Sequence, residues 1–319
     1  MAKKISTKSL ADSVGSEVAN SLEPELKKIS MLGELTLRKK DYSKIDKDVS
    51  SEARNNHNMA VDAGNFRIKP FSSADLKEIT KKNNFIRNYW YEHTRPTTDS
   101  GKGPRLITVR IFSKVKAEME RQLREYGQLV REVASKIDQL IANQKTRMGD
   151  RFDSIGWPTS DEFIEAHSTE IVFNPIPDEK WVVMLDKKVL TELSQRTTSH
   201  IDRMGAVAQN ANWVELLECV NAIIEKTDGL LEEKKVRGKD ETKLSEKSFK
   251  DSLFGNLARV CDIVPDYNVK CDPDLDRTVQ SLKEKLCHDP EKVRTDKKLK
   301  KQIHDDAKLA SQAIADFIA

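Results

Sequence analysis

The chain has 319 residues, of which 34% are charged and 37% hydrophobic, and its formal net charge is only +3 because 55 basic residues oppose 52 acidic ones. This balance excludes a global positive field that would attract nucleic acid, and so low an apolar content is typical of an elongated helical protein rather than a compact globule. No apolar run in the sequence approaches the roughly 18 residues that a membrane-spanning helix needs.

The first part of the chain predicts a flexible tail followed by a small helical region. Residues 1–22 carry few large apolar groups, so we expect a flexible tail. Residues 23–105 are expected to form an N-terminal helical base. Within this base, Ser72 and Asp75 make a variant capping box at the start of a helix that ends before Pro96.

Two long proline-free amphipathic segments, at 106–150 and 186–234, dominate the middle of the chain. Their apolar residues recur at steps of three and four, which is the helical period. At about 1.5 Å per residue, each helix would be roughly 60 Å long. The expected seams are Phe112, Val115, Met119, Leu123, Tyr126, Val130, Val133, Ile137 and Leu140 in the first segment, and Leu190, Leu193, Thr197, Ile201, Met204, Ala208, Ala211, Val214, Leu217, Asn221 and Ile224 in the second.

A single long helix would leave its apolar stripe exposed, so each segment needs a partner. The nearest partner in the chain is the other segment, and we therefore predict a long antiparallel helical hairpin, a coiled-coil-like stalk. An intermolecular coiled coil is the alternative.

The insert between the two segments, residues 151–185, has the features of a β-hairpin. Two short apolar runs, 170–173 and 181–185, flank the turn sequence Asn-Pro-Ile-Pro-Asp. The hairpin would lie at the tip of the stalk, and its aromatic residues are candidates for partner binding. These are Trp157, Phe173 and Trp181.

Residues 242–319 predict a C-terminal three-helix base. The first helix stops at Pro265, and the other two begin at Asp272-Pro273 and Asp289-Pro290, where an aspartate cap precedes proline at the first helical position. The predicted fold class is therefore mainly α, with one small β insert.

The loop before the first long segment reads RPTTDSGKGP over residues 95–104. Its glycines flank a lysine, yet the spacing differs from that of a P-loop, and a proline follows. The loop is either a flexible lead-in to the helix or a weak anion site at the start of that helix. The candidate anion-binding residues are Gly101, Lys102 and Arg105.

Two other groups of residues carry chemistry. Cys261, Cys271, Cys287 and His288 are the one set that suggests a metal, although their spacing is unlike that of zinc modules, and buried thiols also act as small hydrophobes. A basic run is either a solvated helix face or a nucleic-acid-binding surface. It comprises Lys292, Arg294, Lys297, Lys298, Lys300 and Lys301.

Several blocks of the sequence together resemble an uncharacterised family of bacteriophage and prophage proteins. The first block includes Thr94-Arg95-Pro96, Asp99, Gly101 and Arg105-Leu106-Ile107, and the second includes Gly156-Trp157-Pro158. The closest blocks are Phe249–Leu253, Cys261–Pro265, Asp272–Leu275 and His288–Glu291. Thr97 stands where the family has tryptophan, and one residue is inserted before Arg105.

Genes of this family often lie near a MoxR-type AAA+ ATPase, so the resemblance implies a partner or client of a remodelling ATPase. Four cysteines and no leader resembling a signal peptide predict the bacterial host cytoplasm. We found no signature of a catalytic site, cofactor or metal, and therefore expect a non-enzymatic helical adaptor protein of phage origin. The alternatives are a nucleic-acid-binding protein that uses Lys292–Lys301 and an enzyme whose site carries no sequence signature.

Overall fold

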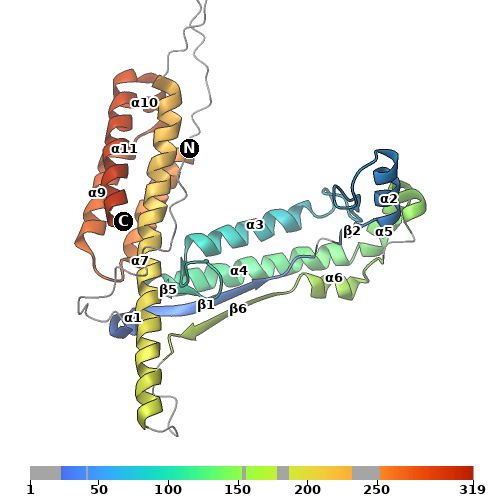
Figure 1. Ribbon diagram of the computed structural model, residues 1–319, viewed down its shortest axis with the longest axis horizontal. Coiled ribbons are helices and arrows are strands. Elements are labelled where there is room, and N and C mark those ends of the chain that lie inside the picture. The colour runs from blue at the N-terminus through green and yellow to red at the C-terminus, as the bar shows by residue number, and fades with distance from the viewer. Residues whose placement is uncertain (1–22, 41, 153–155, 178–186, 232–251, 319) are drawn as a thin grey trace, which may run out of the picture. The chain divides into compact units, whose positions relative to one another are not determined.

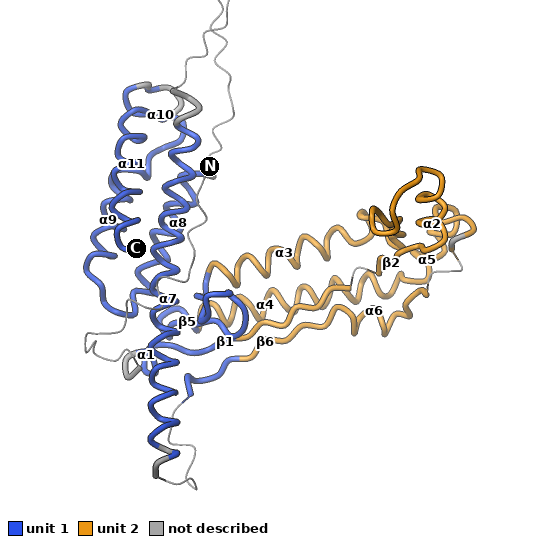
Figure 2. Tube along the Cα trace, in the orientation of Figure 1, with its two compact units in different colours: residues 1–33, 93–112, 173–319 blue, residues 34–92, 113–172 orange. Residues whose placement is uncertain are grey.

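The computed structural model describes residues 23–40, 42–152, 156–177, 187–231 and 252–318 (Figure 1). It is mainly helical with a small antiparallel sheet, which confirms the mainly α part of the predicted fold class. The chain forms two compact units (Figure 2). Unit 1 comprises residues 1–33, 93–112 and 173–319, and unit 2 comprises residues 34–92 and 113–172. The predicted tail, 1–22, lies outside the described residues.

The helices of unit 1 are the long α7 (Lys187–Leu231) and the C-terminal α8 (Ser252–Ile263), α9 (Pro273–Leu286), α10 (Pro290–Thr295) and α11 (Lys297–Ile318), with a 3-10 turn at Val264–Tyr267. α11 packs along α7, and α8 and α9 complete the bundle (Figure 1). Aromatic stacking adds to the α7–α11 contact, because the ring centroids of Trp213 and Phe317 lie 4.5 Å apart. The core of the bundle is apolar and includes Leu216, Val220, Ile223, Leu257, Val264, Leu275, Leu282, Ile303 and Ile314.

The predicted starts of the C-terminal helices are confirmed. The carboxylate of Asp272 accepts a hydrogen bond from the N–H of Asp274, and that of Asp289 accepts one from the N–H of Glu291. A third aspartate, Asp296, accepts bonds from two backbone N–H groups at 2.8 and 3.1 Å. This extra cap divides the single final helix that we expected into α10 and α11.

Unit 1 also contains α1 (Glu23–Ile29), β4 (Arg95–Pro96), β5 (Arg105–Thr108) and the start of β1 (Ser30–Leu37). β1 runs antiparallel to β5, with Ser30 opposite Thr108, and β5 pairs in turn with β4. The strand order of the sheet is β4-β5-β1-β6, where β6 is Thr169–Pro175. A second apolar core covers this part of unit 1, and its members include Leu26, Leu106, Ile201, Met204, Tyr267 and Val269.

Unit 2 contains α3 (Lys77–Glu92) and most of α4 (Val109–Ala134), which lie side by side in Figure 2. Lys82 of α3 forms an ion pair with Glu125 of α4. The helices bury matching apolar faces made of Ile79, Ile86 and Trp90 on α3 and Val115, Met119, Tyr126 and Val130 on α4. The unit also contains α5 (Ile137–Met148), a 3-10 turn at Gly149–Arg151, and α6 (Ser160–Ala166).

The predicted capping box before α3 is confirmed. The N–H of Ser72 donates to the Asp75 carboxylate at 2.8 Å, and the N–H of Asp75 donates to the Ser72 hydroxyl at 3.2 Å. This reciprocal pair satisfies two backbone donors before the first turn of the helix.

The prediction of a single helix over residues 106–150 is wrong. Its first residues belong to β5, and α4 ends at Ala134 before α5 begins at Ile137. At the break, the Ser135 hydroxyl donates to the carbonyl of Glu132 at 2.9 Å, a local bond that competes with helix continuation. A seam counted only from apolar spacing cannot register such a break.

The predicted antiparallel hairpin is not confirmed. Most of the first segment belongs to unit 2, whereas α7 belongs to unit 1, where it packs against α11 and α8. The expected β-hairpin tip is not confirmed either. Residues 170–173 do form a strand, within β6, but its neighbour in the sheet order is β1, and residues 181–185 lie outside the described residues.

Candidate functional site

Of the three aromatic residues proposed for partner binding, the two that the structure describes belong to different units. Trp157 lies in unit 2, where its indole N–H donates to the carbonyl of Phe152 at 3.1 Å. Phe173 lies in unit 1, edge-on to Phe112 with a centroid distance of 4.9 Å. Trp181 lies outside the described residues. Trp157 therefore acts first as a packing residue.

Trp157 is part of an aromatic cluster that stabilises unit 2. Its ring lies 5.7 Å from that of Phe71, and the Tyr42 ring stacks on Phe163 at 5.9 Å. Burial raises the pKa of the Tyr42 hydroxyl to about 12, and burial lowers the pKa of His167, which lies 4.3 Å from the Phe163 ring. Both side chains are therefore kept neutral at neutral pH, as suits an apolar core.

The loop predicted to bind an anion bonds mainly to itself. The N–H of Gly101 donates to the carbonyl of Thr98 at 2.9 Å, and the N–H of Lys102 points to the Ser100 hydroxyl at 3.4 Å. The guanidinium of Arg105 donates to the hydroxyl and the carbonyl of Thr94 at 2.6 and 2.9 Å. Because these donors already have acceptors, the geometry does not favour an anion site here, and that role stays a prediction.

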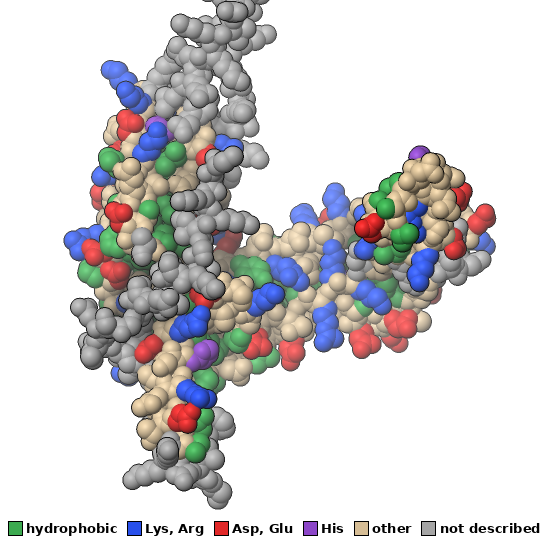
Figure 3. All heavy atoms as spheres, in the orientation of Figure 1, with side chains coloured by type: hydrophobic (Ala, Val, Ile, Leu, Met, Phe, Trp, Pro, Cys, Tyr) green, Lys and Arg blue, Asp and Glu red, His purple; other side chains and the backbone are tan. Residues whose placement is uncertain are grey.

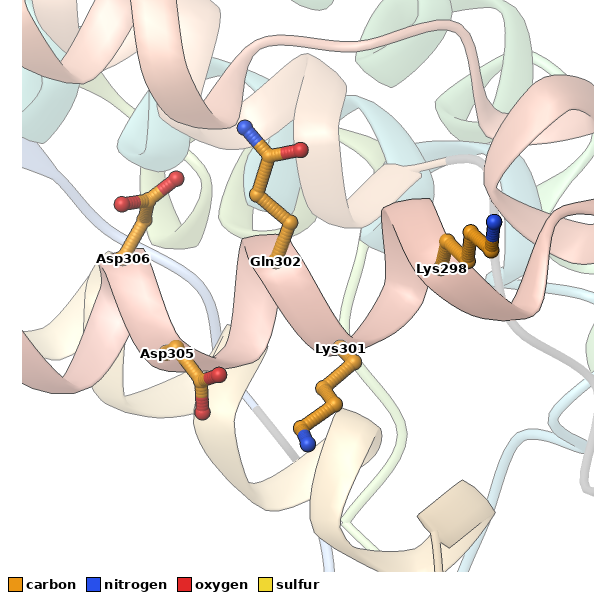
Figure 4. A pocket seen from close by; sticks show the side chains of 5 residues that line it. All are labelled: Lys298, Lys301, Gln302, Asp305 and Asp306. Carbon is orange, nitrogen blue, oxygen red and sulfur yellow. The ribbon is translucent and has the colours of Figure 1, made fainter.

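The basic run lies on α10 and the first turns of α11, and nothing is described of the side chains of Arg294 and Lys297. A shallow hollow of about 450 Å³ lies along α11 and is lined by two lysines of the run together with Gln302 and two carboxylates (Figure 4). These lining residues are Lys298, Lys301, Gln302, Asp305 and Asp306. The carboxylates would repel phosphate, so the hollow does not favour nucleic acid, and binding through this face stays a prediction that salt-dependent retention on DNA would test.

Metal coordination receives no support from the described residues. Within them, no group of three or more His, Cys, Asp and Glu side chains is placed to hold a metal ion. Of the suggested set, Cys261 is buried and Cys271 is exposed.

The candidate site is a small segment of unit 2 that the sequence did not single out. It consists of β2 (Lys44–Ile45), α2 (Lys47–Asn56), the loop 57–66 and β3 (Arg67–Ile68), and we call it the β2–α2–β3 module. β2 and β3 pair antiparallel, with Ile45 opposite Arg67.

Polar contacts hold this module together. Asp46 caps α2 by accepting from two backbone N–H groups, at 3.1 and 3.0 Å. Ser50 connects the helix to the end of the loop, because its hydroxyl donates to the carbonyl of Asp46 and accepts from the N–H of Phe66 at 2.8 Å. Arg54 reaches the same end of the loop and donates to the carbonyl of Gly64 at 3.1 Å and to the Asn65 side chain at 3.0 Å.

Most of the large apolar side chains of the module are left at the surface. Among the described side chains of the module, the buried ones are Asp46, Ser50 and Ile68, so Ile68 is the one apolar residue of the three. Four large apolar residues are exposed instead, and we call them the apolar set: Ile45 (46% exposed), Met59 (43%), Val61 (81%) and Phe66 (51%). Figure 3 shows hydrophobic side chains at the surface of the part of unit 2 that carries α2.

Such an arrangement suits binding rather than catalysis. Single exposed apolar residues are common on protein surfaces, but four within 22 positions of one polar-bonded module are unusual. The one sequence signal was that Met59, Val61 and Phe66 interrupt a polar stretch without helical or strand periodicity. The missing periodicity indicates that these residues do not form the buried face of a helix or strand. It does not indicate what function the side chains have.

No known family profile, no curated protein and no solved structure matches this chain. Among the described residues, no helix is long and apolar enough to cross a membrane.

Proposed function

We propose that this chain is a non-enzymatic protein–protein interaction protein whose partner docks on the apolar set of the β2–α2–β3 module. The observation that carries the proposal is that this module is closed by hydrogen bonds and exposes the four large apolar side chains of the apolar set. The exposed surface of these side chains is not used in folding and remains available for binding.

The energetics support docking at this surface. Burying one large apolar side chain contributes about 1.5–3 kcal/mol. Phe66 retains 51% of its accessible surface and Val61 retains 81%, so Phe66 has about half and Val61 most of that contribution still to gain. Aromatic residues such as Phe66 are frequent centres of binding energy at interfaces.

Preorganisation strengthens the argument. The bonds of Ser50 and Arg54 link α2 to both ends of the stretch 64–66. A loop held in this way loses little conformational freedom when a partner binds. The entropy cost of binding therefore offsets less of the free energy gained by apolar burial.

The partner that fits is a protein segment with an apolar face. The module carries charges of both signs beside the apolar set, including Lys47, Asp48, Glu52 and Asp62, so a strongly charged polymer would meet repulsion as well as attraction. By resemblance to the phage family, we propose a MoxR-type AAA+ ATPase as the first partner to test, and the host cytoplasm as the place of the interaction.

The test compares one double variant and one single control variant of the full chain. Val61→Ser with Phe66→Ser removes the most exposed pair of the apolar set, and Leu309→Ser is the matched control because Leu309 is an exposed apolar residue (65%) of α11. Binding of the purified ATPase is measured by calorimetry, after circular dichroism has verified that each variant is folded. We expect at least a tenfold weaker affinity for the double variant, equivalent to about 1.4 kcal/mol, and an unchanged affinity for the control.

A second measurement separates the site from the partner. Photo-crosslinking amino acids are placed at position 59 or at position 309, and the protein is produced in bacterial host cells. The crosslinks report which surface contacts another protein. Crosslinks from position 59 with no binding to the ATPase would support the site and exclude that partner. Equal crosslinking from both positions would contradict the proposed site.

A further inference from the structure

Three of the four cysteines of the chain gather in the helical bundle of unit 1. Cys261 of α8 is fully buried in the bundle core, and Cys219 of α7 and Cys287 pack against the same core while only partly buried. Cys287 is the residue that ends α9. Cys271 is exposed and does not belong to this core.

Cys261 and Cys287 lie where α8 packs against α9, because the 2.7 Å ion pair of Asp262 with Lys283 joins the residue after Cys261 to the turn of α9 before Cys287. A hydrogen bond between the two thiols raises the pKa of Cys261 and lowers that of Cys287. The contact joins two helices that are consecutive along the chain, since Cys261 lies in the last turn of α8 and Cys287 follows the end of α9. Both sulfur atoms also lie near the ammonium group of Lys283, which forms a 2.7 Å ion pair with Asp262.

The two thiols have opposite chemical properties. The hydrogen bond from Cys261 and the nearby Lys283 lower the pKa of Cys287, whereas the same hydrogen bond and burial raise the pKa of Cys261. Burial also raises the pKa of the third thiol, Cys219, to about 11. Cys287 is therefore the thiol most easily deprotonated in the cluster, and it is also more accessible than Cys261.

We propose that Cys261 and Cys287 form a peroxide-sensitive dithiol, in which Cys287 reacts first and Cys261 then closes an intramolecular disulfide. This site is independent of the docking function proposed for unit 2.

The chemistry balances with hydrogen peroxide as the oxidant. The Cys287 thiolate attacks one peroxide oxygen, the O–O bond breaks, and the hydroxide that leaves takes up a proton to become water. The sulfur of Cys261 then attacks the resulting sulfenic acid, its S–H proton leaves with the hydroxyl group as a second water, and the S–S bond forms. Two thiols lose two electrons in total, and one peroxide is reduced to two waters.

The bond would join the end of α8 to the end of α9. It removes freedom from the unfolded chain between the two cysteines and so makes the bundle harder to unfold. Cys219 is a poor competitor for Cys287 as the first nucleophile, because its raised pKa leaves little thiolate at neutral pH.

The test uses the full chain treated with sub-millimolar hydrogen peroxide, then alkylated and analysed by mass spectrometry without reduction. We expect two of the four thiols to become unreactive, a peptide linked between positions 261 and 287, and full recovery with dithiothreitol. Thermal unfolding of the oxidised protein is expected at a higher temperature than that of the reduced protein.

Three variants assign the roles. Cys287→Ser should abolish the link. Cys261→Ala should stop the reaction at a sulfenic acid on Cys287, detected as one dimedone adduct. The control Cys271→Ser removes the exposed thiol and should leave the link unchanged.

The proposal remains testable if a core variant fails to fold. Phenylarsine oxide binds pairs of adjacent thiols, so in the wild-type protein it should protect Cys261 and Cys287, and not Cys271, from alkylation. Oxidation that links Cys271 between two chains while Cys261 and Cys287 stay reduced would overturn the proposal, as would a bridge between Cys219 and Cys261.

Discussion

At the scale of single residues, Arg95 connects three elements of unit 1. Its side chain is 3% exposed, and its guanidinium donates to the Asn212 amide oxygen at 2.7 Å and pairs with Glu215 at 2.9 Å. The guanidinium carbon also lies 4.5 Å above the ring centroid of Tyr267. One buried cation therefore links β4, α7 and the 3-10 turn before α9.

Replacing Arg95 by alanine should destabilise unit 1 by about 3–5 kcal/mol. The substitution leaves Glu215 without the opposite charge and Asn212 without the hydrogen bond that the guanidinium supplies. Glu215 is 31% exposed and can regain water, which places the expected loss near the lower value. Urea unfolding followed by far-UV circular dichroism measures it. Arg277→Ala is the control, because its ion pair with Asp274 is exposed at the surface, and it should change stability by less than about 1 kcal/mol. Equal effects of the two substitutions would show that the Arg95 network does not stabilise the fold.

His167 should make the stability of unit 2 depend on pH. Burial lowers its pKa in the folded protein, so between that value and the unfolded value of about 6.5 the unfolded chain binds more protons. The contribution of the neutral imidazole is therefore complete above about pH 6.5 and is lost as the pH falls. We expect the difference in unfolding free energy between wild type and His167→Gln to shrink from pH 7.5 to pH 5.5. A difference that stays constant over this pH range would contradict the prediction.

At the scale of elements, α7 shows what the sequence could predict and what it could not. The predicted seam and the buried stripe agree at Ile201, Met204 and Ala208. Beyond Ala208 the buried stripe continues through Asn212, Leu216, Val220 and Ile223, whereas the predicted seam moved to Val214 and Leu217.

The divergence has a physical cause. A count of apolar residues passes over Asn212, yet this side chain is fully buried because Arg95, 117 positions away, donates to it. Long-range polar partners of this kind leave no trace in local periodicity. Capping signals depend on neighbours only, which explains why Ser72, Asp272 and Asp289 were placed correctly. The apolar set was missed for the converse reason, since exposure is a property of the folded module and not of Phe66 or Val61 alone.

The buried stripe of α7 predicts that substitutions at neighbouring positions change the free energy of unfolding by unequal amounts. Leu216→Ala removes a fully buried side chain and should cost about 2–5 kcal/mol, whereas Val214→Ala, at a position 36% exposed, should cost less than about 1 kcal/mol. Chemical denaturation of both variants provides the comparison. A larger loss of stability in Val214→Ala than in Leu216→Ala would support the seam predicted from the sequence instead of the buried stripe.

At the scale of the whole molecule, the chain passes between its two units at residues 33–34, 92–93, 112–113 and 172–173. Each of the two apolar cores described for unit 1 nevertheless draws its buried side chains from unit 1 alone, including Leu282 in the first and Tyr267 in the second. Unit 2 buries its own faces of α3 and α4, with Met119 fully enclosed.

Cores built from separate sets of residues predict separate local stabilities, which hydrogen exchange can resolve. Leu282→Ala creates a cavity in the bundle and should accelerate amide exchange in α8, α9 and α11, while exchange in α3 and the part of α4 within unit 2 stays at its wild-type rate. Met119→Ala is the matched substitution in unit 2 and should produce the opposite pattern. If either substitution accelerated exchange equally in both units, the chain would unfold as one cooperative structure despite its separate cores. Selective exchange in each unit would instead mean that docking on unit 2 and thiol oxidation in unit 1 can act on stabilities that are set independently.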